Sequence, residues 1–147
     1  MSSFLLDTHV WAWSLTGDKR LSPRAVAVIE QTEHIFVSPI SLFEIGQKVR
    51  IGKWPEMEPF VEELPALLQQ QGGEIADLTP AICVNASMMK WGHRDPFDRL
   101  LAATAMDSRI AIISADVVFD ALDDLGDWIA RICKRQTGPI VSSATKS

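Results

Sequence analysis

The chain is long enough for one ordinary domain, and its composition is that of a soluble globular protein. Its 147 residues are 47% hydrophobic and 22% charged, which excludes a disordered, collagen-like or coiled-coil chain. The net charge of -5 argues against a domain that holds nucleic acid by general electrostatic attraction alone.

Short apolar runs alternate along the chain with longer segments of helical period. The predicted strands are residues 3–6, 34–37, 73–76, 110–114 and 128–132. A capping residue followed by proline predicts three helix starts, at Ser22-Pro23, Ser38-Pro39 and Asp95-Pro96. This alternation is typical of β-α units around a parallel sheet. We therefore expect one α/β domain over residues 1–133, and a flexible C-terminal tail, poor in apolar residues, over 134–147.

Acidic residues stand where the predicted strands end. Asp7 directly follows the first strand, Asp116 comes two residues after the fourth, and Glu44 lies early in the helix after the second. Asp98 lies in the first turn of the helix that starts at Pro96. Because parallel strands bring their carboxyl ends to one edge of a sheet, we expect the four carboxylates to share a cleft there.

A cluster of four carboxylates predicts a bound divalent cation. Like charges a few ångströms apart raise one another's pKa and resist joint ionisation, and a cation removes this repulsion. Oxygen ligands suit Mg²⁺ or Mn²⁺ better than zinc. Such an ion lowers the pKa of a bound water and stabilises phosphate oxygens, so the cluster favours phosphodiester hydrolysis.

Each acid also has a structural explanation, which stays open at this point. Asp7 and Asp116 can cap the helices that follow them, and Asp98 can stabilise its helix dipole. Glu44 can form an exposed ion pair with Lys48, four residues further on. Asp98 is the hardest of the four to explain in this way, because the rest of its helix face is apolar.

Four stretches of the chain, in this order, resemble the PIN-domain endoribonucleases, above all the VapC toxins of VapBC toxin-antitoxin pairs: "FLLDTHVWAW", "VSPISLFEIGQKVRIGKW", "HRDPFDRLLAATA" and "IISADVVF". The resemblance covers about residues 4–133. It implies a three-layer α/β/α fold with a central, mainly parallel sheet. It also implies metal-dependent cleavage of single-stranded RNA regions by water activated on Mg²⁺ or Mn²⁺, a homodimer, and a cognate VapB-type antitoxin that holds the toxin inactive.

The resemblance also assigns roles to single residues. The acids expected to bind the metal and to catalyse are Asp7, Glu44, Asp98 and Asp116. The hydroxyls expected to orient these carboxylates are those of Thr8 and Ser114. In this mechanism the three aspartates hold the ion, and Glu44 positions the attacking water or a second ion.

Basic and aromatic side chains near the acids are candidates for substrate contacts. The cations expected to contact substrate phosphates are Lys48, Arg50, Arg94 and Arg99. For Arg99, a structural ion pair with Asp98 is an equal alternative. His9 either packs beside its helix or contacts a phosphate. Tryptophans such as Trp54 can stack on bases, although core or interface packing is the commoner role.

Two other functions are weighed against the nuclease. A phosphatase that forms an aspartyl-phosphate also uses a strand ending in Asp-Thr, but His9 stands where its second acid would be. A catalytically inert PIN-like module that binds RNA or regulates a partner is disfavoured by the complete set of four acids. Metal-dependent thermal stabilisation distinguishes a nuclease from such a module.

The chain carries no pattern for secretion or membrane insertion. No apolar run approaches the roughly 20 residues that span a bilayer, and no basic segment precedes an apolar one at the N-terminus. Cys83 and Cys133 match no metal-binding or redox spacing. We therefore expect a reduced, cytoplasmic protein without membrane contact.

Overall fold

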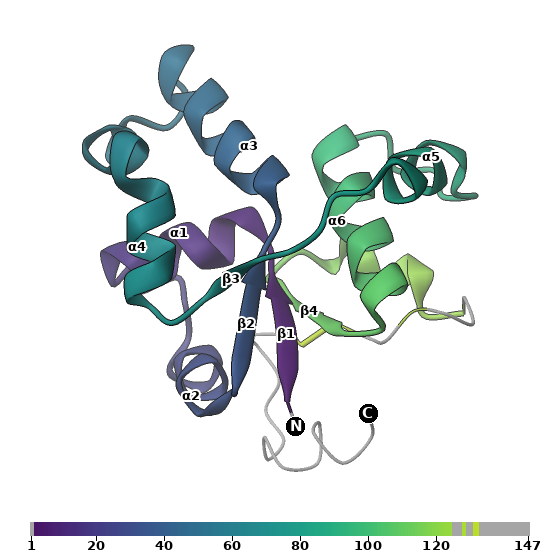
Figure 1. Ribbon diagram of the computed structural model, residues 1–147, viewed down its shortest axis with the longest axis horizontal. Coiled ribbons are helices and arrows are strands. Elements are labelled where there is room, and N and C mark those ends of the chain that lie inside the picture. The colour runs from purple at the N-terminus through teal and green to yellow at the C-terminus, as the bar shows by residue number, and fades with distance from the viewer. Residues whose placement is uncertain (1, 125–127, 129–130, 133–147) are drawn as a thin grey trace.

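A computed structural model describes residues 2–124, 128 and 131–132 (Figure 1). The strands are β1 Ser3–Leu6, β2 His34–Val37, β3 Glu74–Ile75 and β4 Ala111–Ile113. The α-helices are α1 Thr8–Thr16, α2 Pro23–Gln31, α3 Pro39–Arg50, α4 Leu64–Gln70, α5 Pro80–Met88 and α6 Pro96–Ser108. Two 3-10 helices, η1 Pro55–Glu63 and η2 Val117–Leu122, follow α3 and β4.

The four strands form one parallel sheet in the order β3-β2-β1-β4. The predicted strands at 3–6 and 34–37 are confirmed, and those at 73–76 and 110–114 are shorter than expected. Part of the predicted strand 128–132 lies outside the described residues, but Ile132 forms a parallel bridge with Ile113. The strands at 73–76 and 110–114 were predicted too long because an apolar run does not show where the backbone hydrogen bonds between neighbouring strands end.

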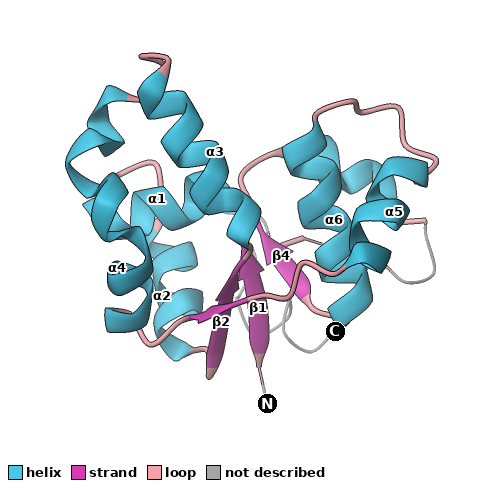
Figure 2. Cartoon of the chain, turned by 45° about the horizontal axis from the view of Figure 1, so that its top comes forward, coloured by secondary structure: helices cyan, strands magenta, loops and turns pink. Residues whose placement is uncertain are grey.

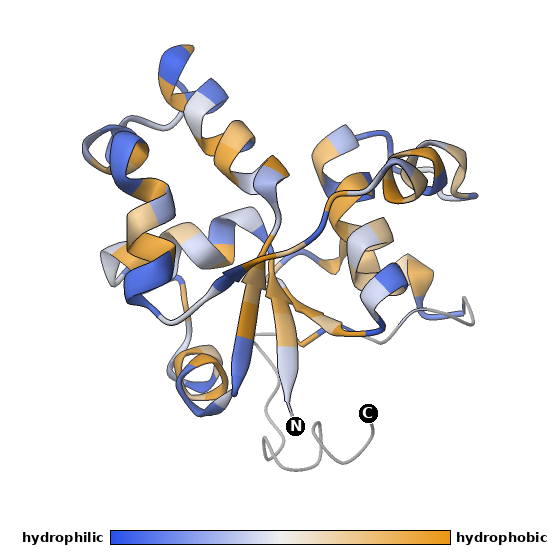
Figure 3. Ribbon diagram, viewed as in Figure 1, coloured by the Kyte–Doolittle hydropathy of each residue, from blue (hydrophilic) through white to orange (hydrophobic). Residues whose placement is uncertain are grey.

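The sheet separates two hydrophobic cores, which confirms the predicted three-layer α/β/α architecture. Leu5 and Leu6 are both fully buried but point to opposite faces of the sheet. Leu6 packs in a core built from α1 to α4, and Leu5 packs against α6 and η2. Figures 1 and 2 show α1, α2, α3 and α4 on one side of the sheet and α5 and α6 on the other. Figure 3 shows the apolar strands between these layers.

Side-chain caps begin the helices where the sequence predicts. The Ser22 hydroxyl accepts from Ala25 N–H at 3.2 Å, and the Ser38 hydroxyl accepts from Ile40 N–H at 3.1 Å. Thr79 precedes Pro80 in the same way and caps α5, a start that the sequence analysis missed. Within the described ranges, no helix is both long and apolar enough to cross a membrane.

Candidate active site

The first predicted acid, Asp7, lies directly after β1 and before α1. Its side chain is only 7% exposed. Val10 N–H donates to Asp7 Oδ1 at 2.8 Å, so Asp7 does cap α1. The Ser114 hydroxyl donates to the other carboxylate oxygen. The capping role and a role in the site therefore coexist, because the two oxygens face different partners.

All four predicted acids, with Thr8, line one open cavity of about 430 Å³. The acids come from separate elements, at the N-terminal end of α1, in α3, in the first turn of α6 and at the N-cap of η2. Asp116 also accepts from Val118 N–H at 3.0 Å. The four acids therefore lie together in one cavity, as the sequence predicts.

The electrostatics of Asp7 favour a cation beside it. Burial raises the pKa of Asp7 from 3.8 to about 7, against the hydrogen bonds from Ser114 and Val10 that lower it. The negative charges of Asp98 and Glu44 make smaller contributions to the same rise. A divalent cation relieves both the desolvation and the repulsion, so this donor set fits the metal ion that the sequence predicts.

Glu44 is buried, so its ion pair with Lys48 is not the exposed pair that would explain it without an active site. The pair with Lys48 exists, with Nζ 2.6 Å from Oε2, but Glu44 is only 5% exposed. Beside it on α3, the buried Ser41 hydroxyl lies 2.8 Å from the Thr8 hydroxyl. This contact ties α3 to α1 next to Asp7. Ser41 was missed because a serine within a helix has no distinctive sequence context.

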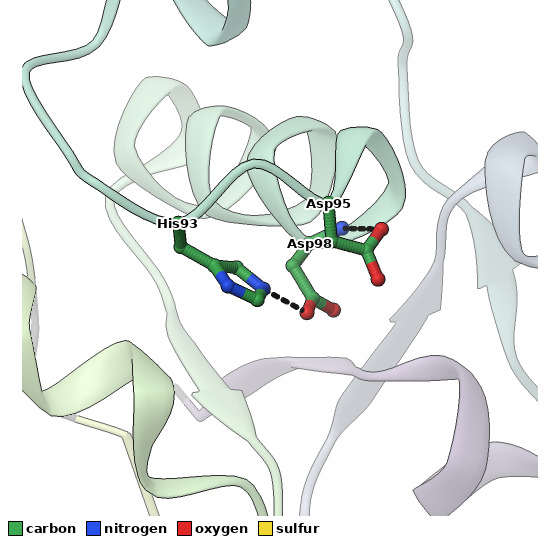
Figure 4. A group of neighbouring side chains, drawn as sticks. All are labelled: His93, Asp95 and Asp98. Atoms are coloured by element: carbon green, nitrogen blue, oxygen red, sulfur yellow. Dashed lines mark hydrogen bonds and ion pairs between the residues drawn. The ribbon is translucent and has the colours of Figure 1, made fainter.

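Asp98 has two neighbours, His93 and Asp95, that were not expected among the metal-binding residues; His93 was considered only as one of the basic residues around Asp98 that could contact phosphate. His93 Nε2 lies 2.6 Å from Asp98 Oδ2, and Asp95 accepts from the backbone N–H of Phe97 and of Asp98. Figure 4 shows the three side chains gathered at the start of α6. Among the described residues, His93, Asp95 and Asp98 form a group whose candidate ligand atoms lie within 4.8 Å of one another.

The pKa of Asp98 is raised, first by burial and then by the charge of Asp95, while His93 lowers it. Asp95 was interpreted only as a helix cap, which it also is. The signal that could have marked His93 as a partner of Asp98 is its place in the "HRDPFDR" motif, five residues before Asp98. A histidine and two carboxylates are a ligand set that divalent metals accept.

Of the predicted substrate-binding cations, Lys48 lines the cavity, whereas Arg50 and Arg94 are exposed and do not line it. Arg99 does not line the cavity either. Its guanidinium donates to five backbone carbonyls, two in the last turn of α5 and three in the segment between α5 and α6: those of Ala86, Ser87, Met89, Trp91 and His93.

A guanidinium has five N–H donors, and all five of Arg99 have acceptors at 2.7–3.3 Å. The prediction that Arg99 contacts substrate phosphates is therefore wrong for this arrangement, and so is its alternative, the ion pair with Asp98. Arg99 instead fixes the segment that carries His93. Sequence could not decide this, because the direction of a long side chain depends on the fold around it.

His9 lies at the rim of the same cavity. Its side chain is exposed, and one ring face stacks on Trp54, with centroids 4.6 Å apart and planes inclined by 26°. Partial desolvation of the imidazole, followed by the charge of Lys48, lowers the pKa of His9. Trp54 itself is 7% exposed, which fits the packing role expected for the tryptophans.

A larger hollow, of about 1040 Å³, lies between α1, α2 and the turn after α4. None of the four predicted acids lines it among the described residues. The smaller cavity is therefore the candidate active site, because the carboxylates converge there.

Comparisons with known proteins agree with this arrangement. Residues 4–125 match the PIN domain family model. The chain is 31% identical over 122 residues to ribonuclease VapC22 of Mycobacterium tuberculosis, covering 79% of this chain and 88% of the relative.

Solved structures share the fold at lower identity. A VapBC2 complex from Rickettsia felis, bound to a promoter DNA fragment, has a TM-score of 0.62 at 15% identity and covers 88% of this chain and 97% of its own. The structure of FitAB bound to the IR36 DNA fragment has a TM-score of 0.59 at 21% identity, and the match covers 92% of this chain and 98% of the FitAB chain. A toxin-antitoxin complex from Klebsiella pneumoniae has a TM-score of 0.54 at 13% identity, and the match covers 85% of this chain and 94% of the chain in that complex.

The predicted resemblance is thus confirmed by the family match, by a relative above 30% identity and by the fold. This result disfavours the aspartyl-phosphate phosphatase, which was weighed on the Asp-Thr pair alone. The chain belongs to the PIN domain family, and within it to the VapC-type proteins.

Proposed function

We propose that this VapC-type protein is an endoribonuclease that cleaves single-stranded RNA regions with the help of Mg²⁺ or Mn²⁺. The observation that carries the proposal is the convergence of four carboxylates in one cavity around Asp7, whose pKa is raised to about 7. The similarity to ribonuclease VapC22 supports RNA as the substrate.

In this proposal the aspartates Asp7, Asp98 and Asp116 hold the ion, and Glu44 positions the attacking water or a second ion. The ion, when bound, supplies an acidified water and charge stabilisation at the cleaved phosphate. Ser114 orients Asp7 through its hydrogen bond, and Thr8 is held by Ser41 beside it. Asp95 and His93 extend the set of side chains that can hold the ion.

The biological setting is also a proposal. The relatives that share the fold are toxin-antitoxin complexes, so we infer that this chain is a cytoplasmic toxin, forms a homodimer and is held inactive by a cognate VapB-type antitoxin. Lys48, at the cavity wall, is the first candidate for a phosphate contact. Arg50 and Arg94 are candidates for contacts further along the RNA.

Cleavage of a fluorescent single-stranded RNA by the purified protein tests the activity. We expect cutting with Mg²⁺ or Mn²⁺, none with EDTA, and a loss of about a hundredfold or more in Asp116→Asn, because a lost metal ligand removes several kcal/mol of transition-state stabilisation. Asp107→Asn, an exposed change on α6, is the matched control and should cut normally. Cutting that persists in EDTA or in Asp116→Asn would contradict the proposal.

Metal binding is expected to stabilise the fold. At a hundredfold excess over its dissociation constant, a ligand adds about 2.7 kcal/mol, which corresponds to a rise in Tm of roughly 5–10 °C for a domain of this size. The rise should be much smaller in Asp98→Asn, and differential scanning fluorimetry with Mn²⁺ measures both. If metal changes neither Tm nor cleavage, the inert-module alternative is favoured.

A further inference from the structure

A second feature of the active-site cavity is its aromatic rim. His9 lies two residues after Asp7, at the start of α1, and lines the cavity together with the four acids and Lys48. Its ring is exposed rather than packed into the core. His9 is not among the candidate metal ligands His93, Asp95 and Asp98 of the described residues, and its contacts are with aromatic rings, so its position in the cavity points to another role.

The ring of His9 is held in place from behind. Trp54 stacks on one face of it at 4.6 Å between centroids, and Trp13 lies tilted at 5.9 Å. Trp54 is itself buried and faces the Lys48 ammonium at 5.7 Å from its ring centroid. A flat ring with a fixed backing and an exposed side is what aromatic stacking on an unpaired base requires.

We propose that His9, backed by Trp54, is a stacking platform for the nucleobase next to the cleaved phosphate. This inference rests on the proposed ribonuclease function. A base lies one sugar away from its phosphate, so a phosphate at the carboxylates brings a neighbouring base to the rim of the same cavity. Lys48, which pairs with Glu44 and lies over the Trp54 ring, is placed to contact the phosphate backbone of the same nucleotide. The platform accepts any base, because every base offers a π-face.

The test compares His9→Ala with His9→Phe, which keeps a flat ring but no nitrogen. We measure kcat and KM on one single-stranded RNA, and on the same RNA with an abasic residue on either side of the mapped cleavage site. His9→Ala should raise KM by about tenfold and change kcat by less than about threefold, because stacking contributes to binding. His9→Phe should keep the KM of the wild type. His34→Ala, at a partly exposed histidine on β2 that pairs with Glu74 and does not line the cavity, is the control and should keep the kcat and KM of the wild type.

The abasic RNAs identify the contact itself. One abasic position should raise the KM of the wild type by about tenfold and leave that of His9→Ala unchanged. An equal penalty in both proteins, or His9→Phe behaving like His9→Ala, would overturn the platform; the latter result would indicate a phosphate contact through the imidazole nitrogens. Melting temperatures of the variants show whether His9→Ala is folded, and His9→Phe keeps the test valid if it is not.

Failure of the platform and failure of the nuclease are distinguishable. Fluorescence polarisation of the same labelled RNAs measures affinity without cleavage. RNA that binds through His9 but is never cut would contradict the proposed function and support the platform. If RNA is cut and the His9 substitutions change neither its affinity nor its KM, the proposed function is supported and the platform is contradicted.

Discussion

Asp7→Asn is expected to abolish RNA cleavage and, at the same time, to stabilise the metal-free protein. The activity falls by about a hundredfold or more because the amide loses the charge that holds the ion. The fold gains because burial raises the pKa of Asp7 to about 7, so the ionised carboxylate is unfavourable in the folded state. Asparagine is as good a helix cap as aspartate, so the start of α1 is kept.

The stabilisation depends on pH in a defined direction. The carboxyl ionises near pH 3.8 in the unfolded chain and near 7 in the folded one, so the folded state holds more protons between these values. Wild-type stability therefore falls as the pH rises from about 4 to about 7. The advantage of Asp7→Asn should be near zero below pH 4 and reach at most about 4 kcal/mol above pH 7, from three pKa units at 1.36 kcal/mol each.

Urea unfolding of the metal-free proteins at several pH values measures this difference. Asp107→Asn, exposed on α6, controls for the change in net charge and should follow the wild type at every pH. An Asp7→Asn variant that is less stable than the wild type at pH 8 would show that the buried carboxylate is not the unfavourable group described above.

Arg99→Met is expected to destabilise the protein by about 3 kcal/mol, the second large effect. Hydrogen bonds from a charged donor contribute roughly 1.5–3 kcal/mol each when buried, but those of Arg99 are partly exposed, so water replaces part of the loss. The corresponding fall in Tm is about 10 °C. Arg99→Lys should recover less than half, because an ammonium has three donors and no fork geometry.

The hydrogen bonds lost in Arg99→Met hold the α5–α6 segment, so the substitution should also affect the active site. His93 lies in that segment and contacts Asp98. At a temperature where Arg99→Met is folded, we expect kcat to fall while the KM for RNA changes little, because Arg99 positions the site and has no donor left for a phosphate. Arg94→Met, an exposed change in the same segment, should keep the Tm of the wild type. A rise in KM alone for Arg99→Met would restore the phosphate-binding role.

Much of the fold and the main acids could be predicted from the sequence, because they depend on local patterns. Apolar runs gave the positions of β1 and β2, and Ser-Pro and Asp-Pro pairs gave the starts of α2, α3 and α6. The place of Asp7, Glu44 and Asp116 after parallel strands was enough to predict a shared cleft. The roles of Thr8 and Ser114 came from the family resemblance and stay predictions, although both lie against the site.

The tertiary structure decided the contacts between distant parts of the chain. Asp7 and Ser114 are 107 residues apart in sequence, and they meet because β1 and β4 pair in a register that places Leu6 beside Ile113. The direction of a side chain is likewise set by its surroundings. Sequence alone determined which acidic side chains are available for the proposed chemistry. The burial of Glu44, the carbonyl contacts of Arg99 and the stacking of His9 on Trp54 depended on the packing of helices around the sheet.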